Sequence, residues 1–297
     1  MDTGRLLECL DTDVARLREV AARDLNAPVP TCPEWTVEDL VRHVANLYQN
    51  VVVRRFRMPE DVPRQDFADD DALDALDRCY AAMTTEFAAR HPGDHVGREA
   101  YETVRYWIRR VAHETAIHRV DAELANPGTA YAEMVHAATL HATAAHTAMA
   151  HTSAVTPIPR DLAVDGIDEM MTEFLVPVTH LFPEEFADHL SDWAGRWVLV
   201  SAGDAAWRVT VRPDGADVTS VDAHPIADGH PVSDTHLAAD THADADAVVH
   251  GDPDALVRWL YNRGGADRVV IDGGDRDRDG DLIARLRRLL TAVTNTA

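Results

Sequence analysis

The 297-residue sequence contains no lysine, few cysteines and no run of about 18 uninterrupted apolar residues. Acidic residues outnumber basic ones 51 to 28, which gives a formal net charge of −23. Because a surface of this charge repels phosphate backbones, we expect no nucleic-acid partner. Without an apolar stretch of membrane-spanning length, and with acidic residues where a signal peptide would be apolar, the chain is expected in the cytoplasm with no membrane partner.

Cysteine pairs and the common nucleotide and hydrolase motifs are also missing. Cys9, Cys32 and Cys79 form no C-x-x-C pair, and their odd number suits a reducing compartment, where each is expected to serve as a small buried hydrophobe. The sequence has no G-x-G-x-x-G, P-loop or G-x-S-x-G motif. Dinucleotide-binding, nucleotide-binding and serine-hydrolase functions therefore have no support.

The N-terminal half carries apolar residues at the spacing of amphipathic helices. Hydrophobic residues make up 46% of the chain and its length suits two domains of ordinary size. Helices are predicted over about 4–23, from Val37 through the mid-fifties, over 72–89 and over 98–124. Their connections favour an up-and-down four-helix bundle, with further helices expected near 130–150 and 166–176.

The C-terminal half changes to the pattern of strands. Short runs rich in Val, Thr and Trp predict strands near 196–203, 205–213, 216–223 and 246–251. A helix, a strand and a closing helix are predicted over 252–263, 268–274 and 281–293. This pattern predicts an α+β domain with an antiparallel sheet and helices on one face. A small, proline-interrupted segment separates the halves, so we predict domains at 1–155 and 156–297.

The chemically informative side chains lie on the predicted fourth helix. Glu114 and His118 stand four residues apart, so they lie about 40° apart on one helix face and can share a ligand. His113 and His118 stand five residues apart, about 140° around the helix, so they cannot both face one ion. An exposed i,i+4 side-chain pair on a helix surface would explain the spacing of Glu114 and His118 equally well.

A metal site would need a third ligand from a facing helix, and His43 on the predicted second helix is the best-placed candidate. Two imidazoles, one carboxylate and an open position describe a catalytic zinc site better than a closed structural one. Nickel, manganese or iron would accept the same ligands. Asp121, three residues after His118, could accept the second ring N–H of that histidine.

Two segments resemble a known family. The stretch T-C-P-E-W-T-V-E-D-L-V-R-H-V at 31–44, followed by H-E-T-A-I-H-R-V-D-A-E at 113–123, resembles the mycothiol-dependent maleylpyruvate isomerase family of the DinB/YfiT-like metalloenzyme superfamily. The segments 165–169 and 251–263 are similar to the opening and the late helix of the C-terminal domain of that family. The resemblance implies a DinB-like four-helix bundle followed by a smaller α+β domain similar to sterol-carrier folds.

The same resemblance implies ligands and cofactors. A zinc ion would be bound by His43, Glu114 and His118, mycothiol would be the thiol cosubstrate, and Arg263 matches an arginine that the family uses near the thiol. The His- and Asp-rich insertion at 222–250 departs from the shorter isomerases. It is expected to be a solvated loop, with adventitious metal capture as the alternative.

The function that follows is a metal- and mycothiol-dependent isomerase or S-transferase acting on a small electrophilic substrate. A divalent cation would hold the thiol as thiolate beside the substrate. Two alternatives fit the same ligands. One is a metal-stabilised binding or regulatory module with a ligand-binding C-terminal domain, and the other is a hydrolase that uses metal-activated water.

Overall fold

The computed structural model divides the chain into two compact units, Met1–Ile158 and Pro159–Ala297. The division predicted from sequence, after residue 155, falls slightly earlier. None of the helices in the described ranges is long and apolar enough to cross a membrane. The structure describes residues 1–57, 63–97, 101–127, 155–191, 193, 195–222, 245–264, 266–272 and 276–296. The predicted helix at 130–150 and residues 223–244 of the insertion lie outside these ranges.

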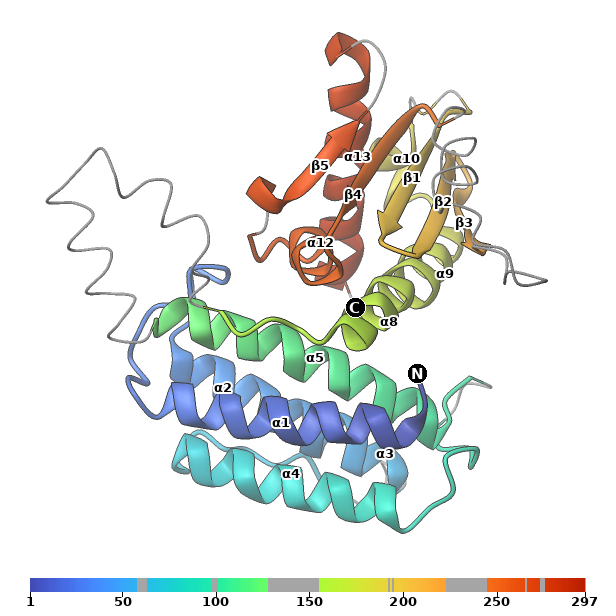
Figure 1. Cartoon of the computed structure of the whole chain (residues 1–297). Coiled ribbons are helices and arrows are strands. Elements are labelled where there is room, and N and C mark those ends of the chain that lie inside the picture. The colour runs from blue at the N-terminus through green and yellow to red at the C-terminus, as the bar shows by residue number, and fades with distance from the viewer. Residues whose placement is uncertain are drawn as a thin grey trace, which may run out of the picture. The chain divides into compact units, whose positions relative to one another are not determined.

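The first unit is a bundle of helices that run side by side (Figure 1). Helix α1 packs along α5, while α2 contacts both α4 and α5. The second helix continues without a break through a π-helical segment, η1, into α3. The predicted bundle is therefore confirmed. Its elements are α1 (Thr3–Ala21), α2 (Val37–Asn46), η1 (Leu47–Val53), α3 (Arg54–Phe56), α4 (Ala72–Ala88) and α5 (Val104–Ala125).

Side-chain caps set the starts of these helices. Thr36 caps α2 through a capping box, in which its side chain accepts a hydrogen bond from the Asp39 amide and the Asp39 carboxylate accepts one from the Thr36 amide. The predicted start at Val37 is thus confirmed. The predicted start of the fourth helix at about residue 98 is wrong, because Thr103 caps α5 by accepting from the Tyr106 amide. A cap of this kind contributes about 1 kcal/mol.

The bundle core is built from the apolar stripes of its helices. Burying a Val or Leu side chain contributes about 1.5–3 kcal/mol, so these stripes supply most of the driving force for association of the helices. Helix α5 is buried over most of its length, and its buried residues include the polar side chains of His113, Thr115, His118, Arg119, Asp121 and Glu123. The core includes Leu6, Leu10, Leu17, Leu40, Val41, Val44, Leu76, Met83, Ile108 and Val111.

The second unit combines helices with a sheet. Within its described residues the sheet has five strands in the order β3-β2-β1-β4-β5 (Figure 1). The strands are β1 (Trp197–Ala202), β2 (Ala205–Arg212), β3 (Gly215–Asp222), β4 (Ala247–Gly251) and β5 (Val269–Asp272). The helical elements are α8 (Arg160–Glu169), η2 (Met170–Leu175), α9 (Val176–Leu181), α10 (Ala187–Leu190), α12 (Pro253–Leu260), η3 (Ala266–Arg268) and α13 (Arg276–Thr296).

The α+β class is confirmed, but the prediction of an antiparallel sheet is wrong in one pairing. Strand β4 lies parallel to β1, whereas β1–β2, β2–β3 and β4–β5 are antiparallel. A tight hairpin can join only antiparallel neighbours, and a parallel neighbour needs a connection of about a dozen residues or more. The connection from β1 to β4, which includes β2 and β3, meets this requirement. Local strand patterns do not reveal which edge the chain returns to.

The central strand β1 is buried on both faces of the sheet. On one face Trp207 donates its indole N–H to Asp168 of α8 at 3.1 Å, in register with buried Val200. On the other face Trp197, Leu199 and Val248 form a smaller apolar cluster. The Arg208 guanidinium covers this cluster, 4.1 Å from the centre of the Trp197 ring. An arginine stem and head over an indole shield apolar surface and keep the charge in contact with water.

Candidate metal centre

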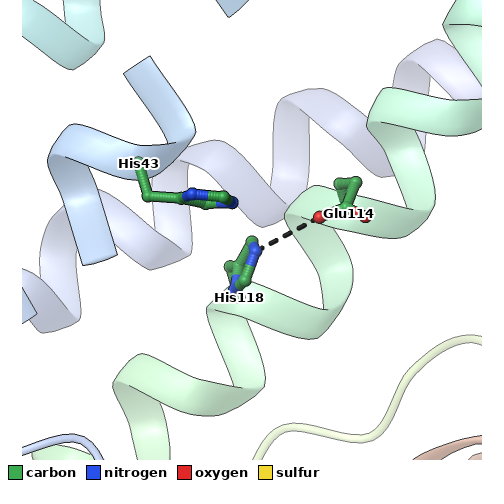
Figure 2. Close-up of side chains that lie close together, drawn as sticks. All are labelled: His43, Glu114 and His118. Carbon is green, nitrogen blue, oxygen red and sulfur yellow. Dashed lines mark ion pairs between the residues drawn. The ribbon is translucent and has the colours of Figure 1, made fainter. Parts of the chain in front are cut away.

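The three predicted ligands meet inside the first unit (Figure 2). His43 projects from α2, while Glu114 and His118 project from one face of α5, one turn apart. One ligand atom from each lies within 4.8 Å of the other two, and His118 Nε2 lies 3.2 Å from Glu114 Oε2. Donors about 2.0–2.1 Å from a tetrahedral ion stand about 3.3–3.4 Å apart. The His118–Glu114 separation is close to this value, and the three residues together could hold a metal ion.

His118 is oriented through its second ring nitrogen. His118 Nδ1 lies 3.0 Å from Asp121 Oδ2, and Asp121 is fully buried. The other oxygen of Asp121 accepts a hydrogen bond from Thr31 Oγ1 at 2.6 Å. A carboxylate on Nδ1 favours the tautomer that carries its proton there and leaves Nε2 free to bind an ion. The contact between His118 and Asp121 predicted from the sequence is therefore present.

His43 stands between Trp35 and His118. Its ring centre lies 4.9 Å from that of Trp35 and 4.9 Å from that of His118, the two imidazoles meeting edge to face at 76°. Burial lowers the pKa of His43 to about 4, and the neighbouring His118 lowers it further in the same direction. The imidazole is consequently neutral near pH 7, which is the form that binds metals.

Glu114 has two different partners for its two oxygens. Oε2 faces His118 Nε2, whereas Oε1 forms an ion pair with the Arg110 guanidinium one turn earlier on α5. Arg110, Glu114 and His118 thus follow one another at four-residue intervals along a single face. The Glu114 side chain is 25% exposed, so this ligand is accessible from the surface.

His113 is not part of the group, although it lies next to Glu114 in the sequence. Its side chain is buried and lies near Asp13 of α1. This position agrees with the helical geometry, which turns His113 away from the face that carries Glu114 and His118. That His113 is not a ligand stays a prediction.

Arg263 belongs to the second unit and lies just beyond a helix. The predicted helix reached residue 263, but α12 ends at Leu260. Asn262 adopts a left-handed φ of 62°, its amide bonds the Trp259 carbonyl, and the Arg263 amide bonds the Arg258 carbonyl at 2.7 Å. This is a Schellman cap, which ends the helix and turns the chain. The Arg263 guanidinium donates to the Tyr261 carbonyl, and its role near a thiol stays a proposal.

Sequence reasoning missed three residues around the ligands. Thr31 bonds Asp121, Trp35 packs against His43, and Arg110 pairs with Glu114. Thr31 and Trp35 lie in the loop just before α2, and an isolated antiparallel bridge between Pro28 and Thr36 closes this loop. The four-residue spacing of Arg110 and Glu114 was a usable signal, because it is the same spacing that joins Glu114 to His118.

The first unit matches a known protein family by sequence. Residues 7–123 match the family model of the mycothiol maleylpyruvate isomerase N-terminal domain, a range that includes all three predicted ligands. No curated protein was found to be similar to the chain.

Two solved structures share the fold. The crystal structures of the mycothiol-dependent maleylpyruvate isomerase and of a point mutant of it are each 14% identical to this chain, with a TM-score of 0.50. Each comparison covers 93% of this chain and 95% of the other. A UbiJ-SCP2 ubiquinone synthesis protein, 13% identical, reaches a TM-score of only 0.25 over 47% of this chain and 97% of its own, so the likeness to sterol carriers stays a prediction. Within its N-terminal unit, the chain is thus similar to the mycothiol maleylpyruvate isomerase N-terminal domain over residues 7–123.

Proposed function

We propose that this protein is a divalent-metal-dependent enzyme that uses a low-molecular-weight thiol, mycothiol. The enzyme would either isomerise a small electrophilic substrate or join the thiol to that substrate through a carbon–sulfur bond (S-transfer). The observation that carries the proposal is the meeting of His43, Glu114 and His118 within a domain of the mycothiol maleylpyruvate isomerase family. Two imidazoles and one carboxylate leave a fourth position open, as in catalytic zinc sites, so zinc is the proposed metal. When bound, the ion would hold the thiol sulfur as thiolate at neutral pH.

The side chains around the ligands would hold them in the right protonation state and orientation before the thiol binds. Neutral His43 needs no deprotonation to act as a ligand, because burial has already lowered its pKa. Asp121 fixes the ring of His118, and Thr31 in turn fixes Asp121. The indole of Trp35 beside His43 limits the access of water on that side. Together these contacts hold the ligand atoms in place and reduce the reorganisation needed on binding.

Two outcomes are open to the thiolate once it has attacked an activated double bond. Formation of the carbon–sulfur bond converts that double bond into a single bond, about which the adduct can rotate. Expulsion of the thiolate then restores the double bond and completes an isomerisation. If the carbon–sulfur bond is kept and the carbanion takes up a proton, the result is S-transfer. Arg263 is proposed to hold a carboxylate of the thiol or the substrate, for which a guanidinium is geometrically suited.

The experiment is metal analysis of the purified protein combined with a thiol-dependent activity screen. We expect one divalent ion per chain and turnover of electrophilic substrates only with mycothiol present. His43→Ala and His118→Ala should each abolish stoichiometric metal, because two remaining ligands hold a divalent ion weakly. His113→Ala is the matched control on α5 and should keep the metal.

Three results would contradict parts of the proposal. Full metal occupancy in both ligand variants would show that the site lies elsewhere. Turnover that does not depend on thiol would indicate a hydrolase using metal-activated water. A wild-type protein that holds its metal but turns over nothing with mycothiol would indicate a binding module.

A further inference from the structure

The Arg110–Glu114 ion pair divides the two oxygens of one carboxylate between different partners. Oε1 of Glu114 is held by the Arg110 guanidinium, and Oε2 faces Nε2 of His118 at 3.2 Å. The Arg110 side chain is only 12% exposed, so water competes weakly for its charge. The pair differs in this respect from the exposed pairs of the same i,i+4 type in the bundle, such as Arg23–Glu19 with 36% and 60% exposure.

The coordination chemistry of carboxylates gives this division a consequence. A carboxylate can bind a metal ion through one oxygen or through both. A guanidinium that bonds one oxygen by a charge-assisted hydrogen bond withholds that oxygen from the ion. With Oε1 bound to Arg110, Glu114 can contribute only Oε2 to an ion that it shares with His43 and His118. The fourth position of a tetrahedral ion then stays available for an exogenous ligand.

The charges around the ligands lead to the same conclusion. Glu114 and the buried Asp121 each bring a negative charge next to the imidazoles, and Arg110 offsets one of them. A divalent ion in this site would therefore keep a net positive charge, which favours an anionic thiolate as the next ligand. Without Arg110 the two carboxylates would neutralise the ion and weaken its attraction for a thiolate.

We propose that Arg110 is a positioning residue that keeps Glu114 a one-oxygen ligand and so keeps the exchangeable position open to the thiol. This inference rests on the proposed function, since it assumes a bound divalent metal and a thiol ligand. A merely structural i,i+4 pair predicts something else: its loss would lower stability slightly and leave the coordination of the metal unchanged.

The test uses the full chain loaded with Co²⁺, whose visible absorption reports the coordination number. Cobalt content, the visible spectrum and a mycothiol titration followed by the sulfur-to-cobalt charge-transfer band are measured for wild type, Arg110→Ala and Arg110→Lys. Arg105→Ala is the control, because Arg105 lies on the same helix and bonds the Met1 carbonyl, away from Glu114.

We expect Arg110→Ala to keep its cobalt, since all three ligands remain. Its visible absorption should weaken, because a second oxygen of Glu114 raises the coordination number, and mycothiol should bind about 10-fold or more less tightly. Arg110→Lys should recover part of the thiol affinity, because a lysine ammonium can still hold Oε1. Arg105→Ala should behave as wild type.

The outcomes separate this inference from the proposed function. If the wild type binds cobalt and mycothiol and Arg110→Ala matches it in both spectrum and thiol affinity, the role of Arg110 is refuted and the proposed function stands. If the wild type binds no cobalt, both fall. Should Arg110→Ala fail to fold by circular dichroism, Arg110→Gln, which keeps most of the volume and removes the charge, is measured against the same two expectations.

Discussion

The buried arginine next to the proposed ligands is predicted to contribute strongly to the stability of the fold. Arg119 of α5 is only 1% exposed, and it donates to Asp13 of α1 at 2.9 Å and to Glu123 at 2.8 Å. It also donates to the Thr156 carbonyl. Replacing it with methionine preserves much of the volume and removes the charge. The perturbation therefore tests the ion pairs more than the packing.

The two acidic partners differ in what they lose. Glu123 keeps Arg16 at 2.7 Å and the amide and hydroxyl of Thr156 at 2.8 and 2.7 Å. Asp13 loses the hydrogen bond that Arg119 Nε donates to its Oδ1, and its second oxygen is buried without a hydrogen-bond partner within the described structure. Removing one member of a buried pair costs about 3–5 kcal/mol, because the other charge stays buried. We expect Arg119→Met to lower the free energy of unfolding by about this amount near pH 7.

The loss of unfolding free energy in Arg119→Met should depend on pH, because the protonation state of Asp13 changes with pH. Burial raises the folded-state pKa of Asp13, although Arg119 opposes this, so Arg119→Met should raise that pKa further. A carboxyl group whose pKa is raised on folding stabilises the folded chain when protonated, and this contribution is lost as the pH rises through the folded pKa. The difference between wild type and Arg119→Met should thus be smaller at about pH 4 than at about pH 7.

Urea unfolding followed by circular dichroism at both pH values checks the prediction. The double variant Asp13→Asn/Arg119→Met should recover most of the loss near pH 7, since it leaves no buried charge unpaired at that position. A loss below about 1 kcal/mol, the level of an exposed ion pair, would refute the reasoning. So would a loss of the same size at the two pH values.

Three further predictions concern the ligands and the cap of α12. Asp121→Ala should weaken metal binding about 10–100-fold in chelator competition, and Thr31→Val should act in the same direction, because both remove support from the His118 ring; unchanged affinity in both would contradict this. Asn262→Val should cost about 1–2 kcal/mol in urea unfolding while Asn262→Gly is tolerated, because a β-branched residue resists the left-handed φ of 62°; equal stability would disprove it. Arg263→Ala should lower thiol-dependent kcat/KM on the order of 100-fold with unchanged metal content, and wild-type kinetics would remove Arg263 from the site.

The helices and the spacing of the ligands on α5 could be read from the sequence. Amphipathic periodicity and the capping signal at Thr36 set the course of the second helix, and the four-residue interval between Glu114 and His118 placed them on one face. These features are local, because helical geometry fixes them within a few residues. The start of α5 was misplaced, since its cap depends on Thr103 and on the segment paired with it at His95.

The contacts that bring the ligand residues together depend on tertiary structure. The contacts of His43 with His118 and of Thr31 with Asp121 join segments far apart in the chain. Trp35 packs on His43 from the loop just before α2. The parallel pairing of β4 with β1 likewise joins distant segments. The sequence supplied the residue types and their helical phase. Packing of the apolar stripes determined which faces meet, because burial of those stripes, and no local preference, sets the position of one helix against another.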